Sequence, residues 1–248
     1  MNDPTNEKMP LTAHLEELRT RLIRSLIAVG VGFLICYAFK EKLFWIISRP
    51  LIGVLPQGSF MIFTGLPEAF FTYLKISFFA GLFLASPVVL YQIWKFISPG
   101  LYQKEKKYVV PFVITSTLLF VGGVCFAYFL VLPPAYKFFV DFSTDFFRPM
   151  FTLREYLSLT LKLLLAFGIV FEIPVFLFFM TKIGLVNPRI LARQRKYAIL
   201  IIFIAAAILT PTPDAFTQIL MALPMMVLYE IGILISKWGE RSRPAASE

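Results

Sequence analysis

The run AFFTYLKISFFAGLFLASPVVLYQIWKFI, residues 69–97, decides the fold of this chain. It contains two lysines and no acidic residue. As a helix it would measure about 43 Å at 1.5 Å per residue, which exceeds the ~30 Å hydrocarbon core of a bilayer. We therefore predict a transmembrane helix that tilts, projects or kinks, with Pro87 as its hinge.

Similar apolar runs recur on both sides of this one. Of the 248 residues, 58% are hydrophobic and 16% are charged, whereas about a quarter of a soluble domain is charged. The pattern predicts an all-α polytopic protein that forms one transmembrane domain, with flexible tails at 1–10 and 239–248. We expect Pro133-Pro134 to end the third span. The six predicted spans are 22–39, 69–97, 109–132, 156–181, 197–209 and 215–236.

The fifth predicted span is too short for an ordinary bilayer. Residues 197–209 would cover only about 20 Å as a helix. We expect this span and the outer part of the sixth to fall short of one face, with local thinning of the bilayer. An ordinary short helix shielded by its neighbours is an equally good interpretation.

The basic residues predict the orientation. With the N-terminus inside, 15 of the 24 lysines and arginines flank cytoplasmic ends of spans, six lie outside, and Lys75, Lys95 and Lys162 fall within spans. This asymmetry favours cytoplasmic N- and C-termini. The outer segments 40–68 and 133–155 read as interfacial helices and loops that cap the bundle. Basic residues beside spans indicate contact with anionic lipid and not with nucleic acid.

Several kinds of chemistry are absent from the sequence. Cys36 and Cys125 both lie in apolar runs, and the single histidine is not part of a metal-binding motif. The chain has no nucleotide-binding Gly-x-x-x-x-Gly-Lys-Ser/Thr loop and no convincing Ser/His pair or paired aspartates at membrane depth. We therefore expect no cofactor, no metal and no enzymatic activity.

Two acids stand out against the basic cytoplasmic edge. Glu17 lies in His14-Leu15-Glu16-Glu17-Leu18-Arg19, and Glu105 lies in a lysine-rich segment that follows Phe96 and other apolar residues. Composition alone favours a local Glu17–Arg21 ion pair worth about 0.2–0.5 kcal/mol, and a solvated charge run around Glu105. Alternatively, the two carboxylates bind adjacent arginines of a ligand, whose hydrophobic part lies on the apolar residues.

Glu172 is an acid of another kind, since it lies deep in the fourth predicted span. An ionisable group there is costly unless it is protonated or paired, so it is a functional candidate. Pro174 frees the carbonyl of Val170 and favours a kink with a polar pocket. In the structural interpretation, a neutral Glu172 donates a hydrogen bond to Gln218 or to a freed carbonyl.

Taken together, these residues resemble the TatC family, the multispanning receptor of the twin-arginine protein translocase. The resemblance covers residues 11–238 and rests on separated motifs in the same order. They are 14–19, Leu55-Pro56-Gln57-Gly58, 86–94, Phe96 with Glu105, 166–168 through 171–174, 209–214, and Tyr229-Glu230-Ile231-Gly232.

The resemblance implies a receptor for folded precursors with twin-arginine signal peptides in the bacterial plasma membrane. It implies that Glu17 and Glu105 grip the arginine pair, with Phe96 and Arg19 in the same patch and Glu16 at a variable position. It further implies export driven by the proton-motive force, and a homo-oligomer within a larger complex.

The resemblance also assigns roles within the membrane and on its outer side. Glu172, with Gln218, would recruit or organise the small single-span partners TatA and TatB. Asp214 and Gln218 match polar positions at the outer end of the last two spans, and Pro50 matches a sensitive proline in the outer loop. The alternative from another class is a proton-coupled small-solute transporter that uses Glu172, although no inverted repeat supports it.

Overall fold

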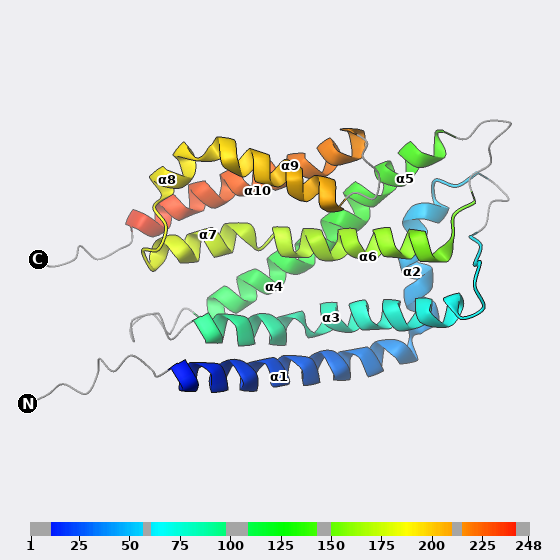
Figure 1. The fold of residues 1–248 in the computed structure, drawn as a ribbon, viewed down its shortest axis with the longest axis horizontal. Helices are drawn as coiled ribbons and strands as arrows, with labels where there is room; N and C mark the ends of the chain where they lie inside the picture. Colours follow the sequence, from blue (N-terminus) through cyan, green and yellow to red (C-terminus); the bar gives the residue numbers. More distant parts are fainter. Residues whose placement is uncertain (1–10, 57–60, 98–108, 143–149, 210–214, 242–248) are drawn as a thin grey trace, which may run out of the picture.

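The structure, a computed structural model, describes residues 11–56, 61–97, 109–142, 150–209 and 215–241 and is helical nearly throughout (Figure 1). The β-structure in this described part is one isolated parallel bridge between Ile62 and Thr152. By length and composition, five helical stretches there could cross a membrane: His14–Ala38, Glu68–Ile97, Val110–Val140, Leu153–Lys182 and Ala215–Trp238. The predicted all-helical architecture is therefore confirmed.

The long helices lie roughly along one direction (Figure 1). The start of α1 and the end of α10 lie at one end of the bundle, here called the terminal end, and the opposite end is the far end. α2 lies across the far end, α8 lies at the terminal end, and α4 crosses the bundle obliquely. The helices are α1 (Leu11–Ala38), α2 (Lys40–Ile52), α3 (Glu68–Ile97), α4 (Val109–Phe126), α5 (Leu132–Val140), α6 (Leu153–Val170), α7 (Ile173–Lys182), α8 (Pro188–Arg193), α9 (Arg195–Leu209) and α10 (Ala215–Arg241).

α1 packs mainly on α3, and two glycines make the contact very close. A Cβ atom on Gly32 would lie 2.6 Å from the Gly81 carbonyl oxygen, and one on Gly81 would lie 2.4 Å from the Phe33 nitrogen. Small residues permit this approach of two backbones in membrane helices, where van der Waals packing drives association. α1 is thereby held in line with α3.

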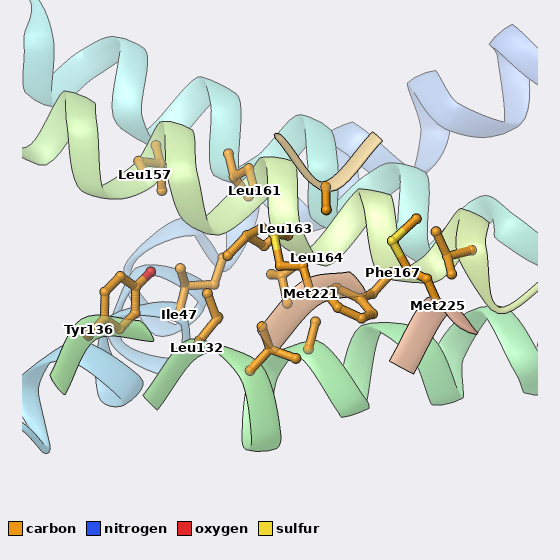
Figure 2. Packing of buried hydrophobic residues seen from close by; sticks show 14 of the residues in the cluster. Ile47, Leu132, Tyr136, Leu157, Leu161, Leu163, Leu164, Phe167, Met221 and Met225 are labelled. Carbon is orange, nitrogen blue, oxygen red and sulfur yellow. The ribbon is translucent and has the colours of Figure 1, made fainter. Parts of the chain in front are cut away.

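The main core surrounds α6, which is the most enclosed of the long helices. Leu157, Leu161, Leu164 and Phe167 are each at most 3% exposed, and they meet side chains from α2, α5 and α10 (Figure 2). Buried hydroxyls are paired with one another: the Tyr136 and Thr160 oxygens lie 2.6 Å apart. α6 thus fixes the positions of the helices around it.

α3 is continuous through Pro87, where a hinge was predicted. Because Pro87 has no N–H, the Phe83 carbonyl lacks its usual helical partner. The Ser86 hydroxyl donates to that carbonyl at 2.7 Å. This bond satisfies the freed group locally, and the helix extends unbroken over 30 residues.

The prediction that Pro133-Pro134 end the third helix is wrong. The π-helix η3 (Ala127–Val131) follows α4, and α5 then begins at Leu132 with proline in its first turn. Proline is tolerated there because the first N–H groups of a helix have no intrahelical acceptor. The helical stretch consequently continues to Val140 at the far end.

The last two helices differ in length more than predicted. α9 has 15 residues, or about 22 Å, so the short fifth segment agrees with the prediction. The description of the sixth span as short is wrong, since α10 has 27 residues and reaches Arg241. Residues 239–241, predicted as part of a flexible tail, are helical because α10 continues past the apolar run.

Candidate functional site

Glu17 lies near the start of α1, at the terminal end of the bundle. Arg21, one turn later, donates to the Glu17 carboxylate from Nε at 2.9 Å and also from Nη2. Glu17 is partly exposed, with 21% of its side chain accessible. The local ion pair favoured by composition is therefore present, and it holds the carboxylate at the edge of the membrane-spanning region.

α3 brings two further side chains to this acid. The Gln92 side-chain oxygen accepts from Arg21 Nη1 at 3.4 Å, and Gln92 is 8% exposed. The His14 ring stacks on Phe96, with centroids 4.6 Å apart and planes inclined by 22°. The Gly32–Gly81 contact further along α1 allows these contacts, because it brings the two helices together. Glu17 and Phe96 thus lie on one surface, here called the acid–aromatic patch, made of His14, Glu17, Arg21, Gln92 and Phe96.

The remaining predicted members of this patch are outward-facing or undescribed. Arg19, Glu16 and Arg24 are exposed on α1. Glu105 lies outside the described residues, so its predicted pairing with Glu17 stays a prediction. In the described part of the patch, the carboxylate of Glu17 is paired with Arg21, and Arg19 and Arg24 lie nearby on α1. A cationic ligand would compete with Arg21 for Glu17.

Glu172 occupies the break between α6 and α7. Helix α6 ends at Val170, α7 restarts at Ile173, and Pro174 supplies the restriction that separates them. Ser116 of α4 lies close to the carboxyl group. The Ser116 hydroxyl accepts from Trp94 Nε1 of α3 at 2.8 Å. The predicted interruption of the helix is confirmed, and polar side chains of α3 and α4 lie beside the acid.

One Glu172 oxygen, Oε1, is buried and has no hydrogen-bond partner in the described part of the chain. The acid lines a groove of about 410 Å³ between α3 and α6–α7, and the other lining residues include Trp94, Ile169 and Phe176. Nearly all of the remaining lining is apolar. A donor from another molecule could therefore reach a carboxyl group that this chain only partly satisfies.

Gln218 lies away from Glu172 in this structure. Its Nε2 donates to the Phe203 carbonyl at 3.1 Å and links α10 to α9. Of the two partners suggested for Glu172, Gln218 is thus engaged elsewhere, and Ser116 is the polar side chain near the acid. Asp214 lies outside the described residues.

Pro50 is buried inside α2 and leaves the Ile46 carbonyl without a helical donor. The Tyr128 hydroxyl of η3 donates to that carbonyl at 2.6 Å. The proline therefore creates the acceptor through which η3 is joined to α2. That Pro50 is functionally sensitive stays a prediction.

Sequence reasoning missed three residues that complete these sites: Gln92, Trp94 and Ser116. Each is less than 9% exposed. Buried polar groups in a membrane helix need partners, so Ser116 inside an apolar run was a usable signal. The described residues contain no group of three or more His, Cys, Asp or Glu that could hold a metal ion.

The described helices define the class of protein first: an all-helical membrane protein with about five long apolar helices. A family model described as Sec-independent protein translocase protein (TatC) matches residues 13–224. A TatC of Desulforapulum autotrophicum is 56% identical over 92% of this chain and 84% of the relative, and that of Escherichia coli K12 is 41% identical over 94% and 90%. A crystal structure of the twin-arginine translocase receptor TatC superimposes with a TM-score of 0.81 at 43% identity, covering 91% of this chain and 99% of that one.

The chain belongs to the TatC family, the receptor component of the twin-arginine protein translocase. It is a multi-pass transport protein and not an enzyme. This membership decides between the two function classes that the sequence left open, in favour of the translocase receptor.

Proposed function

We propose that this chain binds the paired arginines of precursor signal peptides on its acid–aromatic patch. The Glu17 carboxylate, held at the terminal end by Arg21, carries the proposal. An incoming guanidinium displaces Arg21 from Glu17, Glu105 takes the second arginine, and Phe96 supports the apolar part of the peptide. Arg19, exposed on the same helix, repels ligands with further positive charge near that point.

The proposed topology has six crossings with both termini in the cytoplasm of a bacterial cell. The start of α1 and the end of α10 lie at the same end of the bundle, as this topology requires (Figure 1). α9, at about 22 Å, crosses a bilayer that is locally thinned. The terminal end is then cytoplasmic, the far end is the outer face, and the proton-motive force supplies the energy for export.

The second part of the proposal concerns partners. Glu172 has a buried oxygen without a partner on the wall of the groove, which supports a role in contacting the single-span proteins TatA and TatB. Gln218 and Asp214 serve the same partners near the outer end of α9 and α10. Basic residues at the cytoplasmic edge contact anionic lipid, and several copies of the chain assemble within a larger complex.

Peptide binding tests the first part. The purified full chain in lipid nanodiscs is titrated with a fluorescent twin-arginine peptide. Glu17→Gln should raise the Kd for the peptide roughly ten- to a hundredfold, because it removes charge-assisted hydrogen bonds worth about 1.5–3 kcal/mol. Glu16→Gln, the matched control one residue earlier, should change Kd less than threefold.

Two results would overturn this part of the proposal. One is equal binding of a Lys-Lys peptide to the unmutated chain, since lysine lacks the bidentate guanidinium geometry. The other is an equal loss of affinity in Glu16→Gln and Glu17→Gln.

Partner capture tests the second part. Glu172→Gln should retain peptide binding but reduce co-purification of the single-span partners severalfold. Unchanged partner association would leave Glu172 with a structural role only.

A further inference from the structure

Two lysines lie within the membrane-spanning helices that form the walls of the Glu172 groove, between the groove and the far end. Lys75 is on α3 and Lys162 is on α6, and both are exposed. Neither has a hydrogen bond or an ion pair within the described part of the chain. Ionisable side chains at membrane depth are rare and costly, so two of them on neighbouring helices indicate a ligand.

The lysines lie at the same depth because the far ends of α3 and α6 are joined. The Glu68 carboxylate accepts from the backbone N–H groups of Thr64 at 2.8 Å and Gly65 at 3.2 Å, and from that of Arg154 at 2.8 Å. α3 and α6 both run from this junction toward the terminal end (Figure 1). Lys75 is seven residues beyond Glu68 and Lys162 is eight beyond Arg154, or about 10 and 12 Å along the helices.

Both lysines continue the lining of the groove toward the far end. On α3, Lys75 shares a face with Leu82 and Ser86, which follow it at seven and eleven residues. On α6, Lys162 shares a face with Leu165 and Ile169, which follow it at three and seven residues. The lysines therefore flank the far end of the groove, while Glu172 lies toward its other end.

The groove is long and apolar. Its volume is about 410 Å³, and it follows α3 from Leu82 to Ile97, about 22 Å of helix. Most of its lining side chains are apolar. These features suit an extended hydrocarbon chain.

The far ends of α9 and α10 place polar membrane groups near the lysines. Thr217, in the first turn of α10, lines a small cavity together with Leu159 and Leu163, the neighbours of Lys162 in α6. The far end of α10 is thus level with Lys162. Lipid head groups beside the far end of α10 therefore lie deep enough in the membrane for the lysine side chains to reach them.

We propose that Lys75 and Lys162 bind the phosphate of one anionic phospholipid, an acyl chain of which lies in the groove toward Glu172. Two ammonium groups complement the negative head group, and the apolar walls bury the chain. The inference does not depend on how precursors are bound. With the topology proposed above, the lipid comes from the outer leaflet.

Native mass spectrometry of the full chain with added lipid tests the proposal. Phosphatidylglycerol should be retained at least tenfold more than phosphatidylcholine with the same acyl chains. The double variant Lys75→Gln/Lys162→Gln should lose this preference. Lys42→Gln/Lys137→Gln, which removes the same charge from exposed lysines of α2 and α5, should keep it.

A second variant tests the acyl-chain part without altering charge. Ile169→Trp fills the groove from α6 and should reduce phosphatidylglycerol retention severalfold, with an unchanged melting temperature. Equal retention by the Lys75→Gln/Lys162→Gln variant overturns the proposal. So does a double variant that keeps its lipid and loses a single-span partner, because the lysines then serve a protein carboxylate.

Discussion

Glu17 and Glu172 are two acids in opposite situations. Glu17 is partly exposed and is held by Arg21 of its own helix. Glu172 is enclosed at a helix break, lies near the Ser116 hydroxyl, and keeps one buried oxygen without any partner in the described structure. Glu17 can therefore bind a ligand because its own ion pair is weak. Glu172 can accept a hydrogen bond from a ligand because one of its oxygens has no partner.

The largest effect is expected at the enclosed acid. Glu172→Leu should lower export of a twin-arginine precursor at least tenfold, while the melting temperature stays equal or rises. An apolar side chain of similar size removes the cost of burying a poorly satisfied carboxyl group. Export assays and thermal unfolding of the purified chain measure the two quantities, with the exposed Glu155→Leu as control. A marked fall in melting temperature would show that the acid holds the fold together.

The second prediction concerns the contact that places Glu17 beside α3. Gly81→Ala should destabilise the chain by about 1–3 kcal/mol and weaken peptide binding, because its Cβ would collide with the α1 backbone. Gly30→Ala meets nothing within 4 Å and should be neutral or slightly stabilising. Thermal unfolding and peptide titration compare the pair. Equal stability of the two variants would contradict the close helix contact.

A smaller effect is expected at the stacked rings of the acid–aromatic patch. His14→Ala removes the contact with Phe96 and should weaken peptide binding by about 0.5–1.5 kcal/mol, roughly two- to twelvefold. His14→Phe keeps a stacked ring and should retain most of the affinity. If both variants bind equally weakly, the imidazole acts through its polar atoms and not through stacking.

The smallest effect concerns the ion pair itself. Arg21→Gln should tighten twin-arginine peptide binding by about twofold, because an i,i+4 pair is worth about 0.2–0.5 kcal/mol and no longer competes. Arg24→Gln, an exposed neighbour on α1, should change Kd less. Weaker binding in Arg21→Gln would mean that Arg21 positions Glu17 for the ligand instead of competing with it.

The sequence predicted the features that depend on local patterns. Apolar runs gave the long helices, and Pro174 gave the break at Glu172. The i,i+4 spacing gave the Glu17–Arg21 pair. These follow from chain-local rules of length, proline geometry and helical periodicity.

Features that depend on neighbouring helices were not predicted. Nothing near Pro133 shows that a π-helix will precede it and let α5 continue. The partner of Glu172 was expected to be Gln218 of α10 or a freed carbonyl, but the polar side chain near the acid is Ser116 of α4, because the crossing of α4 determines which hydroxyl comes close. Gln92 joins Arg21 across 71 positions of sequence, a contact that only the α1–α3 packing creates.

The Gly32–Gly81 contact is also a fixed point about which α1 could rotate. Glu17 lies 15 residues from Gly32, or about 22 Å along the helix. A rotation of about 10° at the glycines would move the Glu17 carboxylate by about 4 Å, which exceeds the length of a hydrogen bond. The stacked rings of His14 and Phe96 form a second contact between α1 and α3, close to Glu17. Two contacts therefore determine how accurately Glu17 is positioned for an arginine of the ligand. One is the backbone contact at Gly32 and Gly81, and the other is the aromatic stack near the start of α1.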